Sequence, residues 1–221
     1  MMLAQVDQPF VRWGWVFDHL DLIWGQTVEH LVLTGAAVGI GLVLAGILAL
    51  VALRWRWAFQ PISWVAGILY TIPSLALFVM LIPITGLSKT TALIGLVSYT
   101  LLILVHNIVA GVEGVPPEVR EAASGMGYSR WGMLLRVELP LAVPAVIAGV
   151  RIATVTTIGL VTVAALIGEG GLGQLILMGL NRLFTTPLVV GAVLSLALAL
   201  AADASLVAAE RALVPWAGRR S

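Results

Sequence analysis

The stretch Glu121-Ala-Ala-Ser-Gly-Met-Gly127, followed after nine residues by Val137-Glu-Leu-Pro140, is a short charged segment between long apolar runs. A polar amphipathic element cannot rest in hydrocarbon, because lipid leaves its polar groups without hydrogen-bond partners. The segment must therefore lie in water or against another protein, at one face of a membrane. The apolar runs on either side of it determine how the chain crosses that membrane.

The composition places the whole chain in the membrane class. Of its 221 residues, 60% are hydrophobic and 10% are charged, and the mean hydropathy is +1.05. Soluble domains average about 45–50% apolar and about 25% charged residues. The formal charge of +1 indicates no strong attraction to nucleic acid. Because the chain has no cysteine, disulfides, thiolate metal sites and cysteine nucleophiles are excluded.

Five apolar runs are long enough to cross a bilayer, which takes about 20 mostly apolar residues. They predict an all-α integral membrane protein with five transmembrane helices. Buried core helices of a soluble protein are the alternative, which five such runs in one short chain disfavour. The predicted spans are residues 28–53, 62–81, 91–112, 141–167 and 187–206.

Lysine and arginine residues predict the orientation, because they are enriched in cytoplasmic loops. Eight of them fall on one side of the predicted spans and three on the other, with Arg151 inside or near the fourth span. We expect the N-terminus outside, and both the tail 211–221 and the charged loop between spans three and four in the cytoplasm. The eight are Arg54, Arg56, Arg120, Arg130, Arg136, Arg211, Arg219 and Arg220, and the three are Arg12, Lys89 and Arg182.

Residues 1–27 are interpreted as an amphipathic helix in the outer interface, with a disordered tail as the alternative. Tryptophans favour headgroup depth, and an apolar face would lie on the membrane. No secretory signal peptide is expected, since no apolar run with a small-residue cleavage site follows the first basic residue. The apolar stripe recurs at three- and four-residue steps and comprises Phe10, Trp13, Phe17, Leu20 and Trp24.

The charged loop predicts two short helices. Pro116 and Pro117 can begin a helix but cannot continue one, and Gly127 helps to stop the first helix. Ser129 can cap a second helix, and Pro140 marks a bend into the fourth span. A DNA-binding helix-turn-helix is disfavoured, because four acidic residues accompany three basic ones between two spans. An ordinary connecting loop is the other alternative.

The spacing of this segment resembles the EAA loop of ABC importer permeases: Glu-Ala-Ala, three residues, glycine, nine residues, then aliphatic-x-Leu-Pro. In that family the loop is the socket for a separate ATPase subunit. The resemblance implies that the first helix docks in a groove of the ATPase and transmits its ATP-driven closure as a rigid-body motion. Val137 stands where the family usually has isoleucine, a conservative departure. The implied coupling residues are Glu121, Ala122, Ala123, Gly127, Leu139 and Pro140.

The resemblance covers about residues 28–210 and implies a permease domain of the methionine-transporter type. Four segments resemble the osmoprotectant branch, which handles glycine betaine, choline, carnitine and related quaternary amines; an amino acid or another small solute is the alternative cargo. These segments are Tyr70-Thr-Ile-Pro-Ser-Leu-Ala, Glu121-Ala-Ala-Ser-Gly-Met-Gly, Arg136-Val-Glu-Leu-Pro-Leu-Ala and Ala165-Leu-Ile-Gly-Glu-Gly-Gly-Leu-Gly.

The implied machine has two permease chains, two cytoplasmic ATPases and an extracytoplasmic binding protein in a bacterial inner membrane. The chain contains no G-x-x-x-x-G-K-[ST] loop, so ATP and magnesium are expected on the ATPase. We expect no cofactor, catalytic residue or metal site on this chain. Five spans can hardly enclose a gated path, which favours a dimer of identical or paralogous permeases. The aromatic cage for a quaternary ammonium group is expected on the binding protein.

Candidates for the translocation path lie in the second and third spans and in the glycine-rich segment after the fourth. A proline inside the second span predicts a kink, and interrupted helices often line transport paths. They also occur in helices that are merely packed, and packing is the alternative role for the two tyrosines. A solvated loop carboxylate is the alternative for the glutamate. The candidates are Tyr70, Pro73, Ser74, Tyr99 and Glu169.

The glycine-rich segment 168–173 formally fits the dinucleotide pattern G-x-G-x-x-G. That pattern requires a preceding strand and a βαβ unit, whereas here it follows a membrane helix. We interpret it as an irregular, closely packed turn at the outward mouth.

Polar residues at membrane depth suggest function by default. Arg151 and Asp203 are expected to form a structural pair, and His106 and Asn107 lie near the inner end of the third span. An ion-coupled carrier or channel is the other functional class, but such proteins usually place acidic residues or broken helices at the midplane, where we predict no acidic residue. An enzyme is disfavoured by the lack of a metal-ligand cluster or a serine–histidine pair.

Overall fold

The structure is a computed structural model that describes residues 10–214 of the chain. Within that range every regular element is a helix, which confirms the predicted all-α class. In chain order the elements are α1 Trp13–Asp18, α2 Leu20–Arg54, α3 Arg56–Thr71, α4 Ser74–Thr85, α5 Lys89–Glu113, α6 Pro117–Gly125, α7 Arg130–Met133, η1 Leu134–Glu138, α8 Leu139–Ala164, η2 Ala165–Ile167, α9 Leu172–Asn181 and α10 Thr185–Leu213.

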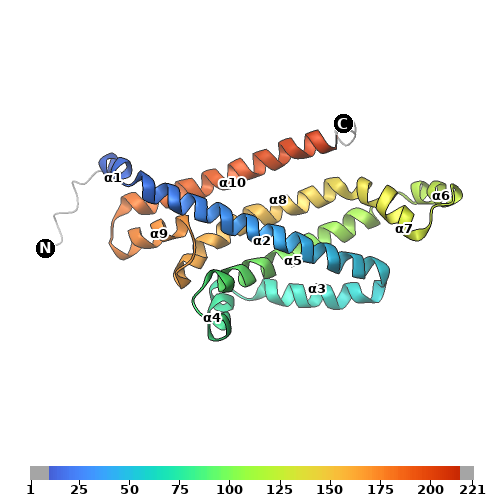
Figure 1. Ribbon diagram of the computed structural model, residues 1–221, viewed down its shortest axis with the longest axis horizontal. Coiled ribbons are helices and arrows are strands. Elements are labelled where there is room, and N and C mark those ends of the chain that lie inside the picture. Colours follow the sequence, from blue (N-terminus) through green and yellow to red (C-terminus); the bar gives the residue numbers. More distant parts are fainter. Residues whose placement is uncertain (1–9, 215–221) are drawn as a thin grey trace.

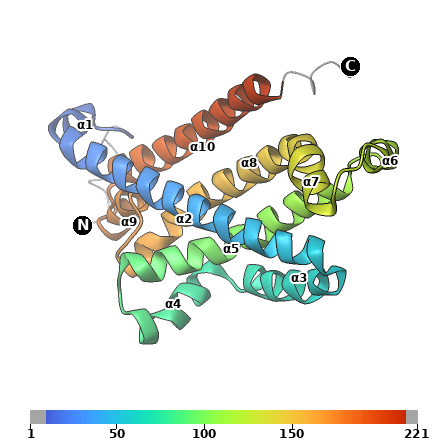
Figure 2. The same ribbon diagram turned by 45° about the vertical axis from the view of Figure 1, so that its right-hand side comes forward.

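Four long helices, α2, α5, α8 and α10, form the body of the molecule (Figures 1 and 2). Each is long and apolar enough to cross a membrane. α5 contains the predicted span 91–112 and α10 the span 187–206, while α8 with η2 covers the span 141–167. The helices predicted over these three runs are therefore confirmed.

The helix α2 contains the predicted span 28–53 but begins eight residues earlier, at Leu20. Its 35 residues extend about 52 Å at a rise of about 1.5 Å per residue, well beyond the hydrocarbon thickness of about 30 Å. The chain is therefore helical without a break at residue 27, and α2 must tilt or project from the bilayer. The apolar stripe of the N-terminal segment is exposed, and residues 1–9 of that segment lie outside the described residues.

The second span predicted over residues 62–81 is not one continuous helix. The chain forms α3 and α4 instead, and their axes differ by 100°. Pro73 disfavours a helical conformation at the residue before it, and Ile72 is extended, with φ −65° and ψ 128°. The Tyr99 hydroxyl of α5 donates to the Ile72 carbonyl, which satisfies a backbone acceptor that the break leaves free. A broken helix therefore replaces the expected kink.

The core is centred on α5, which packs against α2, α3, α4 and α8. One apolar cluster joins α2, α4, α5 and α8 through residues such as Phe78, Leu96 and Val161. A second joins α2, α5 and α8 nearer the other end, through residues such as Leu104 and Ala153. Small residues let these helices approach closely. At Gly149 of α8, for example, an added Cβ would lie only 2.6 Å from the Asn107 side chain of α5, so a larger residue would push the two helices apart.

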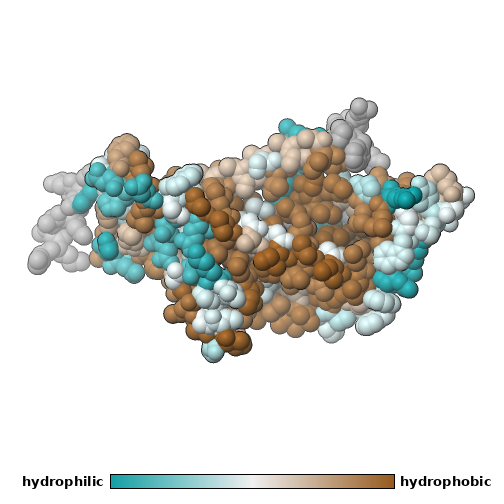
Figure 3. Space-filling model, in the orientation of Figure 1, coloured by the Kyte–Doolittle hydropathy of each residue, from teal (hydrophilic) through white to brown (hydrophobic). Residues whose placement is uncertain are grey.

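An apolar surface covers the middle of the molecule, and hydrophilic side chains gather toward its two ends (Figure 3). α10 contributes much of this surface, since only 11% of its most apolar stretch is buried within the chain. Leu196 and Leu200 on that helix are 61% and 64% exposed. Such exposure fits contact with lipid or with another membrane subunit.

Candidate functional site

The EAA-like loop, residues 116–140, joins α5 to α8 and lies at one end of the molecule (Figures 1 and 2). α1, α4 and α9 lie toward the other end. The loop consists of α6, α7 and η1, so the two predicted short helices are confirmed.

The local sequence accounts for both helices of the loop. Pro117 is the first residue of α6, where its missing N–H removes no helical hydrogen bond. α6 ends at Gly125, and Gly127 takes a φ of +80°, which glycine adopts without steric cost. The Ser129 hydroxyl accepts a hydrogen bond from the Gly132 N–H at 3.1 Å, which confirms the predicted cap of α7.

The second helix continues into the fourth span without interruption, in place of the bend expected at Pro140. Residues 130–167 form one helical run, with the π-helical segment η1 just before Pro140. Pro140 lies in the first turn of α8. Because proline supplies no N–H and crowds the preceding turn, a wider π turn there lets the helix pass through.

The predicted coupling residues differ in exposure and in position along the loop. Glu121, Ala122 and Gly127 are exposed at the tip of the loop, whereas Ala123 is buried and ties α6 to the loop. Leu139 and Pro140 lie at the start of α8, where Leu139 packs with the apolar cluster of Val112, Leu134 and Ala142. Met126, the residue that follows α6, is 70% exposed. An apolar and acidic surface is therefore free for a partner.

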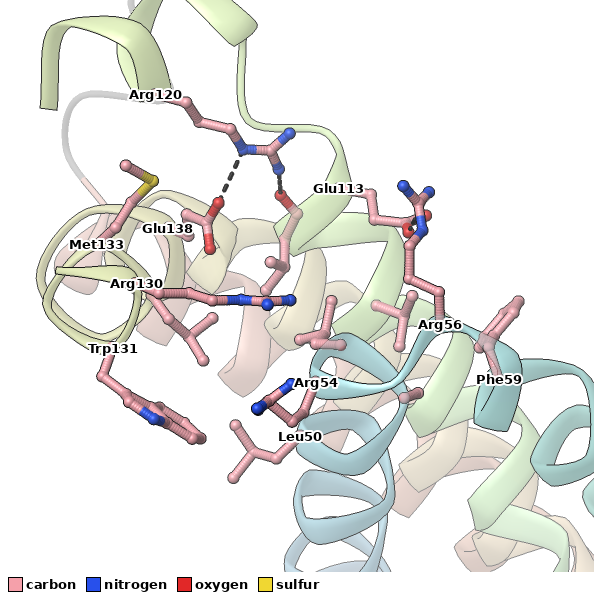
Figure 4. A pocket seen from close by; sticks show the side chains of 15 residues that line it. Leu50, Arg54, Arg56, Phe59, Glu113, Arg120, Arg130, Trp131, Met133 and Glu138 are labelled. Atoms are coloured by element: carbon pink, nitrogen blue, oxygen red, sulfur yellow. Dashed lines mark hydrogen bonds and ion pairs between the residues drawn. The ribbon is translucent and has the colours of Figure 1, made fainter. Parts of the chain in front are cut away.

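The residue before Glu121 fixes the loop to the body of the protein (Figure 4). The Arg120 Nε donates to the Glu138 Oε1 at 2.8 Å, and its Nη2 donates to the Val112 carbonyl at 2.7 Å. The side chain of Glu138 is 15% exposed, so water screens this ion pair only in part. The sequence showed both charges and gave no sign of their pairing, because they are 18 residues apart.

A cavity of about 620 Å³ lies beside the loop (Figure 4). Its walls come from the end of α2, the start of α3, the end of α5, and from α7 and η1. Arginines and tryptophan line it together with apolar side chains, among them Arg54, Arg130 and Trp131. These three residues belong to two elements far apart in the sequence, α2 and α7, so no local pattern predicts that they meet.

The candidate path residues of the second and third spans come together at the break between α3 and α4. The rings of Tyr70 and Tyr99 meet edge to face with centroids 5.8 Å apart. Pro73 precedes Ser74, the first residue of α4. Tyr99 is 5% exposed and Tyr70 is 39% exposed, so only Tyr70 offers much surface to a passing solute.

Glu169 lies apart from this group, in the glycine-rich turn after η2. It is half-buried, whereas one alternative was a solvated loop carboxylate. Burial raises the pKa of its carboxyl above the ordinary 4.5, the charge of Lys89 opposes that rise and the charge of Glu29 adds to it. Lys89 pairs with Glu29 at 3.7 Å. The turn is closely packed as expected. A Cβ on Gly171, whose φ is +48°, would lie only 2.6 Å from the backbone nitrogen of His30, so a side chain has no room there.

The expected pair of Arg151 and Asp203 is confirmed and joins α8 to α10. The Arg151 Nε and Nη2 donate to the Asp203 Oδ1 and Oδ2 at 2.9 and 3.2 Å. Glu210, about two turns further along the same side of α10, forms an ion pair with the Arg151 Nη1 at 3.6 Å and was missed. His106 contacts Ser63 at 3.1 Å. These are contacts between helices of one chain, which supports a structural role.

The protein is a bundle of apolar helices with one broken span and an exposed, rigidly held loop. These features are those of a membrane transport subunit that another protein drives. Comparison with known proteins identifies the family. Residues 37–214 match the model of the binding-protein-dependent transport system inner membrane component, and the chain belongs to this family. It is thus a permease subunit of an ABC importer rather than an enzyme, and the ATPase is a separate subunit.

The relatives that match most of the chain include the following two permeases. The osmoprotectant import permease protein OsmW of Salmonella typhimurium strain LT2 is 34% identical over 91% of this chain and 96% of its own. The glycine betaine/carnitine/choline transport system permease protein OpuCB of Bacillus subtilis strain 168 is 35% identical over 86% of this chain and 88% of its own. The expected resemblance to the osmoprotectant permeases is thereby confirmed.

Among solved structures, the inward-facing MetNI methionine ABC transporter is similar, with a TM-score of 0.78. The match covers 89% of this chain and 98% of the transporter chain at 20% identity. At that identity it establishes the fold, which is the expected methionine-transporter type.

Proposed function

We propose that this permease carries quaternary ammonium osmoprotectants, such as glycine betaine, choline or carnitine, through a path that it forms with a second permease. The observation that carries the cargo assignment is the match of nearly the whole chain to two permeases named for these solutes. Tyr70, which is 39% exposed at the α3–α4 break, gives a cation a π surface to pass.

The exposed tip of α6 is the contact for the ATPase. Glu121 and Ala122 present a charge and a small side chain on a helix of nine residues. Arg120 holds that helix against the ends of α5 and η1. A displacement of α6 by the ATPase then moves two spans together, and Leu139 and Pro140 carry it into α8. ATP and magnesium are bound by that partner.

The EAA-like loop lies in the cytoplasm, with the N-terminus outside. In the described part of the chain, six basic residues belong to the loop or to the helix ends on its side of the spans, and three belong to the opposite side. This asymmetry supports the inner-membrane orientation that positive-inside loops adopt. The opposite end, with Glu169 and the glycine-rich turn, then faces the binding protein. The six are Arg54, Arg56, Arg120, Arg130, Arg136 and Arg211.

A second permease completes the path. Residues 10–214 contain four helices that could each cross a membrane, or five spans if the bent pair counts as one. The apolar face of α10 is largely uncovered by the rest of the described chain. The path residues Tyr70, Pro73, Ser74, Tyr99 and Glu169 are then positions to be tested in the assembled dimer.

Transport competition tests the cargo. The permease is reconstituted in liposomes with its ATPase and binding protein, and ATP-dependent uptake of radiolabelled glycine betaine is measured. Unlabelled choline, carnitine and glycine betaine are offered as competitors, with methionine as the matched amino acid. ATP-dependent uptake of glycine betaine that choline or carnitine inhibits and methionine does not supports the proposal, whereas the absence of any ATP-dependent glycine betaine uptake would refute it.

Co-purification tests the coupling contact. Glu121→Ala is expected to release the ATPase from the detergent-purified complex, because it removes the exposed charge of α6. Glu118→Ala changes a carboxylate in the first turn of the same helix and serves as the control. An unchanged ATPase content in Glu121→Ala, or full transport by the permease without any ATPase, would contradict the assignment.

A further inference from the structure

The cavity beside the EAA-like loop has an excess of positive charge. Four arginines and two glutamates line it, which leaves a formal charge of +2. The two glutamates already pair with two of the arginines, at 2.8 and 3.5 Å. In the described part of the chain, no carboxylate lies within 4.0 Å of the two others, Arg54 and Arg130. An anion is therefore the ligand that these two arginines fit.

Arg54 and Arg130 reach the cavity from different elements. Arg54 ends the membrane helix α2, and Arg130 begins α7 in the loop. Figure 4 shows both guanidinium groups projecting into the same space, between the turn from α2 to α3 and the loop. Guanidinium groups bind phosphate oxygens through paired N–H donors, so two of them can grip one phosphate.

The remaining wall of the cavity is apolar. Leu50 and Leu53 of α2, Phe59 of α3 and Leu134 of η1 line it. Leu50 is 37% exposed, so part of its surface is open to a ligand. The Trp131 side chain is 54% exposed beside them, and tryptophan is enriched at the level of lipid headgroups. A small inorganic anion would leave this apolar surface unused.

We propose that the cavity binds one anionic phospholipid. Its phosphate lies between Arg54 and Arg130, and the upper parts of its acyl chains lie on Leu50, Leu53 and Leu134. The end of an apolar spanning helix is at the depth where a headgroup and its acyl chains meet, and basic pockets at that depth attract anionic lipids. The lipid fills the space between the α2–α3 turn and the loop. The site does not depend on which solute the permease carries.

Native mass spectrometry of the purified, full-length permease complex tests the site. Phosphatidylglycerol is titrated into the detergent-solubilised complex, with phosphatidylcholine as the zwitterionic comparison and glycerol phosphate as the headgroup without chains. We expect one tightly bound phosphatidylglycerol per permease chain. The double variant Arg54→Gln/Arg130→Gln is expected to lose about 30-fold in apparent affinity, from two charge contacts. Arg136→Gln, an exposed arginine of the same loop outside the cavity, should bind as the unchanged protein does.

A second variant tests the apolar wall without touching the charges. Leu50→Trp fills the cavity from α2 and should weaken phosphatidylglycerol binding while Arg54 and Arg130 remain. The proposal is overturned if the double variant binds phosphatidylglycerol as tightly as the unchanged protein, or if phosphatidylcholine binds equally well. Equal binding of glycerol phosphate would show a soluble phosphate site instead. Loss of the ATPase from the double variant with lipid binding intact would show that the arginines face the partner.

Discussion

Arg120 and Glu138 connect the two helical parts of the EAA-like loop through an ion pair of 2.8 Å. The same arginine donates to the carbonyl of Val112 at the end of α5. A single side chain, adjacent in sequence to Glu121, therefore links α6 to the end of one spanning helix and to the start of the next. A force on α6 reaches both helices through hydrogen bonds instead of being lost in a flexible connection.

Arg120→Gln should separate ATP hydrolysis from transport. The variant removes a charge-assisted pair and leaves Glu138 half-enclosed without a partner, a change worth on the order of 2 kcal/mol. If the ATPase docks on α6 as proposed, it can still close there, so we expect solute uptake to fall several-fold more than ATP hydrolysis. The measurement is the number of ATP molecules hydrolysed per solute transported in proteoliposomes. Equal losses of both rates would show that the pair serves binding or folding alone.

The matched control is Arg136→Gln, since Arg136 is exposed on η1 and makes no ion pair with any described residue. Arg136→Gln should leave the number of ATP molecules hydrolysed per solute transported unchanged. Glu138→Gln should reproduce the effect of Arg120→Gln, and the double variant should be little worse than either single one. Strictly additive effects of the two substitutions would show that the residues act independently.

Tyr99→Phe should loosen the break between α3 and α4. The Tyr99 hydroxyl donates to the Ile72 carbonyl, and its loss leaves a backbone acceptor unpaired, at a cost of about 1–3 kcal/mol. We expect a lower thermal unfolding midpoint of the purified protein. Tyr70→Phe is the matched control, because no hydrogen bond of the Tyr70 hydroxyl is found among the described residues, and its midpoint should barely change. A larger effect at Tyr70 would contradict this account.

The long helices could be predicted from the sequence because lipid imposes a simple length requirement on apolar runs. The break in the second span could be predicted only in part. Pro73 marks the place, since it restricts Ile72, but the 100° angle also depends on contacts such as that of Tyr99, which is 27 residues further along the chain. A local pattern does not contain that information.

The candidate sites divide in the same way. The pair of Arg151 and Asp203 could be predicted because two opposite charges at membrane depth have few other partners. Glu210 was missed, although it lies seven residues after Asp203 and thus near the same helix face. The ion pairs of Arg120 with Glu138 and of Lys89 with Glu29 depend on how separate helices pack.

Asp203→Asn should destabilise the protein more than Glu210→Gln does. Asp203 makes a bidentate contact with Arg151 at 2.9 and 3.2 Å, whereas Glu210 lies 3.6 Å from the same guanidinium group. These side chains are roughly one-third exposed, so screening limits the difference to about 1 kcal/mol. Thermal unfolding in detergent measures it. If Glu210→Gln is the more damaging variant, the pair with Asp203 is not the main link between α8 and α10.

Glu169→Gln should change how stability depends on pH. Burial raises the pKa of the Glu169 carboxyl above its ordinary 4.5, so the folded protein holds this proton more tightly than the unfolded chain. Its contribution therefore favours the folded state at low pH and is lost as the pH rises from 4.5 through the folded-state pKa. We expect the fall in unfolding midpoint across this window to be smaller in Glu169→Gln. Lys89→Gln removes the cation that opposes the rise in the Glu169 pKa. In this variant the fall in the unfolding midpoint should therefore extend to higher pH. Identical pH profiles of all three proteins would show that Glu169 titrates as an exposed carboxyl does.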